Sequence, residues 1–272
     1  MVRRSGKPTT QEKFLGLVLE ATTTVVEILQ ANGIQCAVFG SLASKLYGSP
    51  RDPQDVDILV FQDTRTPETQ ILSTEELKQL IYRTRPGDFY LKDPRDQEAT
   101  YKILIYRPSP SAHRPARTMK QIIRLPDPEC KVDILIPGTM YLPHLRPELV
   151  QWHQVEATES RRLRARIANA IPLVPFSLLL VHKLQGWDDN RKHEESYKRD
   201  RRHKDAKDVK RLLNLTAPVK ALVERGADTW NDTELFSEEL QELTVQRVRD
   251  FVQEFPGLAI KWAELGFGVG QA

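Results

Sequence analysis

Two aspartates separated by a single residue are the groups in this sequence best placed to do chemistry. Asp55 and Asp57 begin a run of β-branched and aliphatic residues that predicts a strand over residues 56–61. Because side chains at positions i and i+2 of a strand point to the same face, both carboxylates project together. They repel each other unless a cation joins them. The pair therefore indicates a metal site; the alternative is an aspartate pair that caps a local turn.

A third acid, Asp133, lies between apolar neighbours in a second predicted strand, residues 131–136. If the two strands are neighbours in one sheet, three carboxylates converge. Ligands that are all oxygen suit Mg²⁺ or Mn²⁺, which bind a few protein carboxylates together with the phosphates of a substrate. The alternative for Asp133 is an incidental acid in a short strand.

A Gly-Ser pair precedes these acids at a point where a predicted strand, residues 35–39, turns into a short helix, residues 42–47. Gly40 lets the backbone approach a ligand closely. The N–H groups at the start of the helix, where Ser41 lies, suit an anion such as phosphate. Lys45 follows on the helix, where it either reaches a phosphate or faces water.

This order of motifs resembles the nucleotidyltransferase superfamily of DNA polymerase β, and within it most resembles the AbiEii-type nucleotidyltransferases, which are known as toxins of bacterial abortive-infection and toxin–antitoxin systems. The shared pattern is a strand, Gly-Ser, a short helix, Asp-Val-Asp and a later lone Asp. Two motifs of the helical half also match, namely Lys183 in an apolar helix and the Lys-Asp-x-x-Asp segment at residues 204–208. Arg51 matches the arginine that often precedes the aspartate pair, whereas Pro53 stands where the family usually has Ser or Thr.

The resemblance implies a role for each matched residue. Asp55 and Asp57 hold one or two divalent ions that bridge a triphosphate, and Asp133 completes the second metal position and helps to deprotonate the acceptor hydroxyl. Lys183 binds phosphate, with a lysine that extends to the surface as the alternative. Asp205 orients Lys183 or a catalytic water, with an ordinary helix-surface acid as the alternative. The expected nucleotide contacts are Gly40, Ser41, Lys45, Arg51, Lys183 and Arg202.

The elements around these residues predict a mixed α/β (α+β) first half and a helical second half. A helix begins at the capping box formed by Thr9 and Glu12 and ends before Gly33. Further helices are predicted at residues 42–47, 74–84, 206–213, 217–225 and 234–255 and after Pro175, and strands at residues 35–39, 56–61, 101–106, 119–125 and 131–136. The resemblance implies a nucleotidyltransferase fold with a short mixed sheet flanked by helices. We expect a catalytic domain over residues 1–145 and a mostly helical domain over residues 146–272.

Composition indicates the class of protein and its surroundings. The 272 residues are 40% hydrophobic and 28% charged, enough for a buried core. No stretch reaches the ~18 unbroken apolar residues typical of a membrane helix, and Cys36 and Cys130 are too few for a disulfide framework. We therefore expect a soluble cytoplasmic protein with no membrane partner.

Positive charge is concentrated in one segment. Residues 191–211 contain ten Lys or Arg and five Asp or Glu, a local charge of +5 in a chain of net charge +3. Such a segment is typical of contact with a polyanion, or of a solvated helix face.

Together these features predict an enzyme of the phosphotransferase class, a metal-dependent nucleotidyltransferase. It moves a nucleoside monophosphate from an NTP to an acceptor hydroxyl and releases pyrophosphate. The acceptors to consider are an RNA such as tRNA, a protein and a small molecule, and a partner antitoxin is unknown. The alternatives are a non-catalytic nucleotide-binding or interaction module on the same fold and a structural protein whose acids are incidental.

Overall fold

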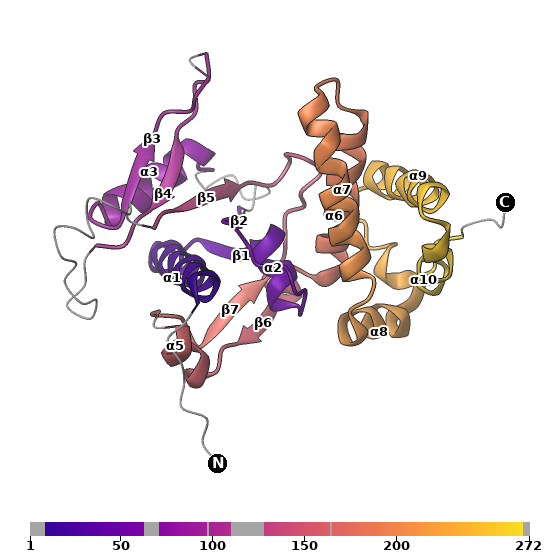
Figure 1. Ribbon diagram of the computed structural model, residues 1–272, viewed down its shortest axis with the longest axis horizontal. Coiled ribbons are helices and arrows are strands. Elements are labelled where there is room, and N and C mark those ends of the chain that lie inside the picture. Colours follow the sequence, from indigo (N-terminus) through magenta and orange to yellow (C-terminus); the bar gives the residue numbers. More distant parts are fainter. Residues whose placement is uncertain (1–8, 63–70, 97, 110–127, 164, 269–272) are drawn as a thin grey trace. The chain divides into compact units, whose positions relative to one another are not determined.

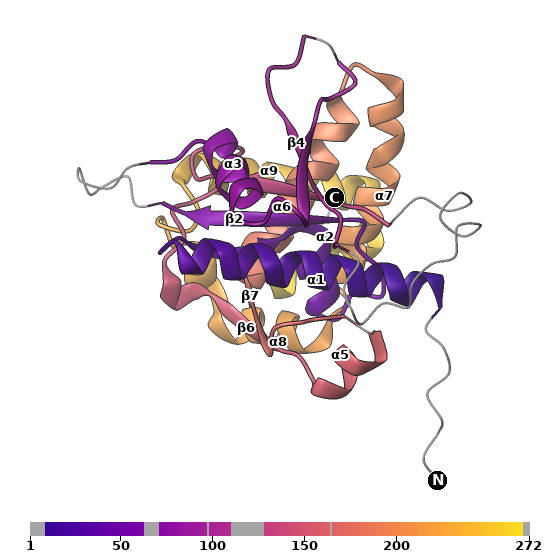
Figure 2. The same cartoon turned by 90° about the vertical axis from the view of Figure 1, so that its left-hand side faces the viewer.

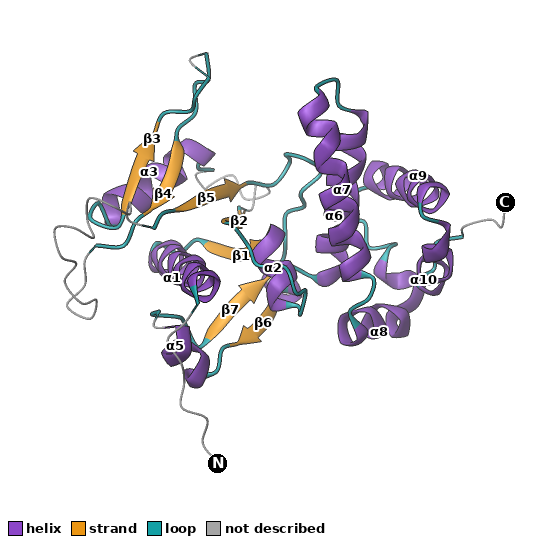
Figure 3. Ribbon diagram, in the orientation of Figure 1, coloured by secondary structure: helices purple, strands orange, loops and turns teal. Residues whose placement is uncertain are grey.

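The computed structural model describes residues 9–62, 71–96, 98–109, 128–163 and 165–268 (Figure 1). The chain divides into two compact units. The first consists of residues 1–42, 52–137 and 150–173, and the second of residues 43–51, 138–149 and 174–272. Every strand of the described residues belongs to the first unit, and the second unit is built from helices and loops (Figure 3).

The first unit is built on a mixed sheet that has seven strands among the described residues, in the order β3-β4-β5-β2-β1-β7-β6. β2 is parallel to β5 and β1 is parallel to β7, and the other neighbouring pairs are antiparallel. The strand bounds are β1 Gln35–Phe39, β2 Asp55–Phe61, β3 Phe89–Lys92, β4 Ile103–Tyr106, β5 Cys130–Leu135, β6 Gln151–Gln154 and β7 Ala170–Leu173.

Two long helices, α1 (Thr10–Ala31) and α3 (Thr74–Thr84), pack on this sheet. α1 contacts β1, β2 and β5 and lies lengthwise alongside β2 (Figure 2), and α3 contacts β3 and β5. Both helices begin at a capping box, Thr9 with Glu12 and Ser73 with Glu76, which satisfies N–H groups that have no partner within the helix. Burial of their apolar faces holds the sheet in place.

α1 is the one helix of the described part of the chain that is long and apolar enough to cross a membrane by length and composition. In its apolar window, 72% of the residues are buried inside the structure. The core helix of a folded domain shows the same combination, because it needs apolar residues over most of its surface.

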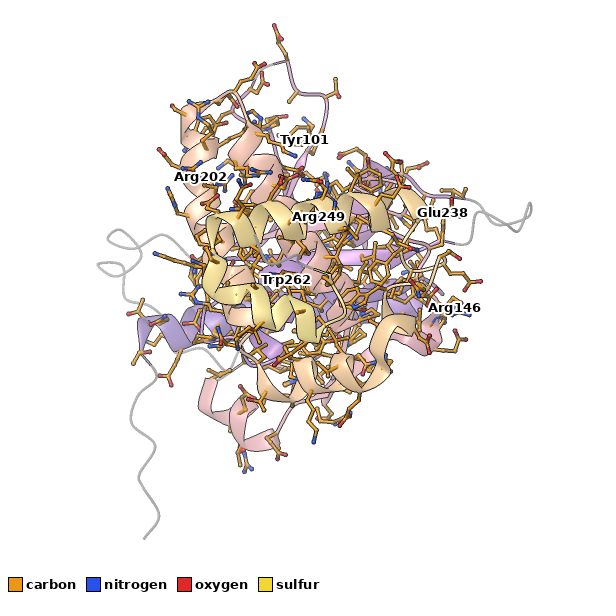
Figure 4. All side chains as sticks on the ribbon, turned by 90° about the vertical axis from the view of Figure 1, so that its right-hand side faces the viewer. Tyr101, Arg146, Arg202, Glu238, Arg249 and Trp262 are labelled. Carbon is orange, nitrogen blue, oxygen red and sulfur yellow. The ribbon has the colours of Figure 1, made fainter. Side chains whose placement is uncertain are left out.

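In the second unit, helices pack around aromatic side chains. α6 (Phe176–Lys192) contacts both α7 (Ser196–Leu212) and α9 (Glu238–Glu254). Trp187 of α6 meets Phe251 of α9 edge to face, with ring centroids 4.8 Å apart, and both are fully buried. Trp262, labelled in Figure 4, is likewise fully buried and lies on α10. The remaining α-helices of the described residues are α2 Gly40–Leu46, which the unit boundary crosses, α5 Ala157–Leu163 in the first unit, and α8 Thr216–Arg225 and α10 Ala259–Glu264 in the second.

The sequence predicts the long elements well and omits several short ones. The helix over residues 74–84 has the predicted bounds, and the strands expected at 35–39, 56–61, 101–106 and 131–136 are β1, β2, β4 and β5. The strand expected at residues 119–125 lies outside the described residues. β3, β6, β7, α5 and α10 were not predicted; the strands among them have only four residues each, too few to show a period.

The compact units differ from the domain boundary expected after residue 145. β7 pairs with β1, and β6 pairs with β7. These later strands therefore complete the sheet of the first unit, and residues 43–51 are assigned to the second unit. The chain passes from one unit to the other several times, which a change of composition along the sequence does not reveal.

Ile58 lies at the centre of β2, opposite Val38 of β1 and Ile134 of β5, and is fully buried. We expect Ile58→Ala to lower the free energy of unfolding by about 2–5 kcal/mol, because it leaves a cavity in a packed core. Denaturant unfolding followed by circular dichroism measures this loss. The matched control is Ile71→Ala at a side chain that is 50% exposed, for which we expect a change within about 0.5 kcal/mol. Equal losses in both variants would contradict this account of the core.

Candidate metal centre

The register of two parallel strands sets the position of the three acids. β2 pairs with β5 so that Asp57 is opposite Asp133 and Asp55 is opposite Lys131. Residues 55 and 57 share one face of β2, and residues 131 and 133 share the same face of β5, because side chains alternate along a strand. The apolar residues between them are fully buried on the opposite face. This alternation therefore places the three acids on one face of the sheet.

The three carboxylates converge closely. One oxygen from each of Asp55, Asp57 and Asp133 lies within 4.8 Å of the other two, and all three residues are half-buried. Like charges at this separation repel each other strongly unless a cation lies among them. The donor set consists of oxygen alone, which suits hard divalent cations. The predicted convergence of the three acids is confirmed, and the residues present fit a metal site.

Gly40 shows how closely the backbone approaches one of these ligands. It follows β1 directly and has a φ of +61°, a conformation that glycine adopts without strain. A Cβ atom placed on Gly40 would lie 1.8 Å from Oδ2 of Asp57 and 2.7 Å from its Cγ. The site thus requires glycine here for space as well as for backbone conformation, since any side chain would displace a metal ligand.

Two polar side chains contact the carboxylates directly. The hydroxyl of Ser41 donates a hydrogen bond to Oδ1 of Asp55 at 3.1 Å. The ammonium of Lys131 donates to Oδ2 of Asp133 at 2.6 Å. Burial lowers the pKa of Lys131, but the hydrogen bond to Asp133 and the charges of the three carboxylates raise this pKa by more. Lys131 is therefore a stable cation beside the three acids.

Cys130 precedes Lys131 and points to the other face of β5, where it is buried. Burial raises the pKa of the Cys130 thiol to about 12, and the three nearby carboxylates add to the rise. Burial likewise raises the pKa of Cys36 in β1 to about 12. Both thiols stay protonated and act as packing groups, as the sequence indicates.

In the second unit, α6 and α7 bring Lys183 near Asp205. Asn190 of α6 donates a hydrogen bond from Nδ2 to Oδ2 of Asp205 at 2.7 Å. Burial raises the pKa of Asp205, although this hydrogen bond and the charge of Lys183 act in the opposite direction. Asp205 is half-buried and held by a partner, so it is not an ordinary acid of a solvated helix face.

The other acid of the Lys-Asp-x-x-Asp segment, Asp208, is 4% exposed and lies between two arginines of the second unit. Arg51 pairs with its Oδ2, and Arg211 pairs with its Oδ1 at 3.1 Å. Lys45 of α2 donates to the carbonyl oxygen of Pro50 at 3.3 Å. In the structure the polar groups of Arg51 and Lys45 thus contact protein groups, and their nucleotide contacts stay predictions.

The basic segment at residues 191–211 is partly neutralised within the second unit. Arg191 pairs with Asp188 and Asp250, and Lys192 also pairs with Asp188. Arg202, labelled in Figure 4, is half-buried on α7. The segment is therefore less free to attract a polyanion than its formal charge indicates, and the nucleotide contact of Arg202 stays a prediction.

The structure thus places the predicted residues in two clusters, one in each unit. In the first unit, Gly40, Ser41, Asp55, Asp57 and Asp133 form the candidate metal centre. In the second unit, Lys183 and Asp205 lie close together. Lys131 and Asn190 were not predicted. A sequence signal existed for Lys131, because it lies two residues before Asp133 and so shares its face of the strand, whereas Asn190 has no signal in its spacing.

No protein-family model and no curated protein matches the sequence. The structure is similar to the crystal structure of an antigenic nucleotidyltransferase-like protein from Paracoccidioides brasiliensis, with a TM-score of 0.55 and 16% sequence identity. The match covers 92% of this chain and 93% of that one. Together with the mixed sheet and its flanking helices, this likeness shows that the chain has a nucleotidyltransferase fold, as the sequence motifs predict.

The close approach of Gly40 to Asp57 generates a test of the site. We expect Gly40→Ala to weaken the binding of Mn²⁺ by at least about tenfold, the size of effect typical of disturbing the surroundings of a metal ligand. Isothermal titration calorimetry with Mn²⁺ measures the affinity. The control is Gly33→Ala, where φ is +72° and no atom lies within 4 Å of the added Cβ. It carries the same kind of backbone strain, so equal weakening in both variants would contradict the steric explanation.

The raised pKa of Asp205 predicts how stability depends on pH. The folded protein binds this proton more tightly than the unfolded chain does, so the stability that Asp205 contributes is present at low pH and is lost as pH rises through its folded pKa. Asp205→Asn is neutral at every pH. We expect it to raise the melting temperature slightly at neutral pH, with the gain disappearing in acid.

Thermal unfolding across a range of pH measures this difference. Asp200→Asn on the exposed face of α7 is the control and should change the melting temperature little at any pH. A melting temperature of Asp205→Asn below that of the unaltered protein at neutral pH would show that the charged form of Asp205 stabilises the fold, contrary to this prediction.

Proposed function

We propose that this chain is a metal-dependent nucleotidyltransferase that transfers a nucleoside monophosphate from an NTP to an acceptor hydroxyl. The observation that carries the proposal is the convergence of Asp55, Asp57 and Asp133 within 4.8 Å, with Gly40 directly against Asp57. A fold alone does not define a function. Here the fold and a fitting set of ligands support the same reaction.

In this reaction, the acceptor oxygen forms a bond to the α-phosphorus of the NTP while the bond from that phosphorus to the bridging oxygen of the β-phosphate breaks. Pyrophosphate leaves with the bond electrons. One or two Mg²⁺ or Mn²⁺ ions, when bound, stabilise the charge on the attacking and leaving oxygens. Asp55 and Asp57 hold the ions, and Asp133 also accepts the proton of the acceptor hydroxyl. Ser41 keeps Asp55 oriented through the hydrogen bond to Oδ1.

Residues of the second unit complete the proposal. We assign Lys183 to the phosphates of the nucleotide. Asp205 orients the Lys183 ammonium, whose charge acts on the pKa of Asp205. Gly40, Ser41, Lys45, Arg51 and Arg202 are the further nucleotide contacts proposed from the sequence motifs. The resemblance to AbiEii-type proteins supports an RNA acceptor such as tRNA and a toxin-like activity, and the composition supports a cytoplasmic location; a partner antitoxin is unknown.

Transfer of label tests the enzyme directly. The protein is incubated with each α-³²P-labelled NTP, Mg²⁺ and total RNA, and labelled acceptors are separated on a denaturing gel. We expect label in an acceptor with the unaltered protein and a loss of roughly 10³-fold or more with Asp57→Asn, because a metal ligand is removed. Asp228→Asn, at an exposed acid outside both clusters, serves as the control and keeps full activity.

Two results would count against the proposal. Label transfer that survives in Asp57→Asn would show that the three acids do not carry the reaction. Binding of NTP without transfer to RNA, to protein or to small molecules of a cell extract would favour a non-catalytic nucleotide-binding module on the same fold.

A further inference from the structure

Lys131 brings a positive charge into direct contact with Asp133, one of the three acids of the candidate metal centre. It shares its face of β5 with Asp133, and its register partner on β2 is Asp55. Its Nζ lies 2.6 Å from Oδ2 of Asp133. One oxygen of a metal ligand is therefore already occupied by a charged donor of the protein itself.

The charges of the centre show what this contact does. The three carboxylates and the Lys131 ammonium together carry a formal charge of −2, which one divalent ion balances. A second divalent ion is repelled by the Lys131 ammonium and by the first ion. It also competes with Lys131 for the oxygens of Asp133. The ammonium thus lowers the affinity of the centre for metal while no nucleotide is present.

Lys131 is also accessible to solvent. Its side chain is 46% exposed, and that of Asp133 is 33% exposed, so the ammonium lies at the open side of the centre. A lysine on a flexible four-carbon chain is a common ligand of phosphate. A triphosphate brought to the three acids therefore offers Lys131 a second anionic partner within reach of the same side chain.

We infer that Lys131 is an internal cation that exchanges between Asp133 and the triphosphate, and so couples complete loading with metal to the arrival of the nucleotide. The inference rests on the proposed function and concerns the same site. Without nucleotide, Lys131 occupies Asp133 and disfavours metal there. When the NTP binds, the ammonium moves to a phosphate oxygen and releases the Asp133 carboxylate to the metal. Lys131 is thus a positioning residue for Asp133 and a binding residue for the substrate.

The test measures metal binding without any turnover. Mn²⁺ alone is titrated into the protein, and free Mn²⁺ is followed by electron paramagnetic resonance. We expect Lys131→Gln to bind Mn²⁺ more tightly by roughly tenfold, the order expected when a unit charge is removed beside a divalent ion in largely aqueous surroundings. Lys131→Arg keeps the charge and should bind Mn²⁺ as the unaltered protein does. Lys92→Gln removes an exposed lysine at the end of β3 in the same sheet and should have little effect.

A second measurement examines the phosphate contact. At saturating Mg²⁺, the dissociation constants of α,β-non-hydrolysable NTP analogues are compared. Lys131→Gln should weaken the analogue that binds best by about tenfold, the size of one lost charge contact to phosphate, and Lys131→Arg should largely restore it. Circular dichroism confirms that each variant is folded.

The outcomes separate the inference from the proposed function. If replacing Asp57 does not change the affinity for Mn²⁺, the three acids do not form a metal centre. The role inferred for Lys131 is then overturned as well. If Mn²⁺ binding depends on Asp57 but is unchanged or weaker in Lys131→Gln, Lys131 merely orients Asp133, and only the inference is overturned. Tighter Mn²⁺ binding with unchanged nucleotide affinity supports the competition for Asp133 and overturns the transfer to phosphate.

Discussion

Repulsion among three carboxylates on one face of a sheet is the constraint on which the candidate site depends. Asp55, Asp57 and Asp133 lie where the strand register forces them together, and such a cluster of half-buried carboxylates is unfavourable without cations. Two neighbouring groups each reduce the unfavourable free energy of this repulsion. Ser41 donates a hydrogen bond to one acid, and Lys131 places a positive charge on another. The three acids with these neighbours form a candidate site that a divalent ion would complete.

The strands and the backbone around these acids determine where their carboxylates lie. β2 is a central strand, paired on one side with β1 and on the other with β5, and its residues Val56, Ile58, Leu59 and Val60 are fully buried. Gly40 approaches Asp57 so closely that no side chain fits between them.

In the helical unit, Asp205 is half-buried, and burial raises the pKa of its carboxyl. Groups of this type are frequent at functional sites, although structural networks also contain them. Asp208 shows the structural case, because it is enclosed by Arg51 and Arg211 within the same unit. Two acids three residues apart in one motif therefore have different surroundings.

The chemistry of the site was largely determined by the sequence itself. Alternation along a strand fixes that Asp55 and Asp57 share a face, and the glycine before them has a local conformational reason. These are short-range effects, and so are the capping boxes that begin α1 and α3. Only the tertiary structure decided that β5 lies beside β2 in parallel, that Asp133 is opposite Asp57, and that Lys131 contacts it. It also decided that β6 and β7 join the sheet. Pairing between distant strands depends on how the whole apolar core packs, and no local pattern of residues contains that information.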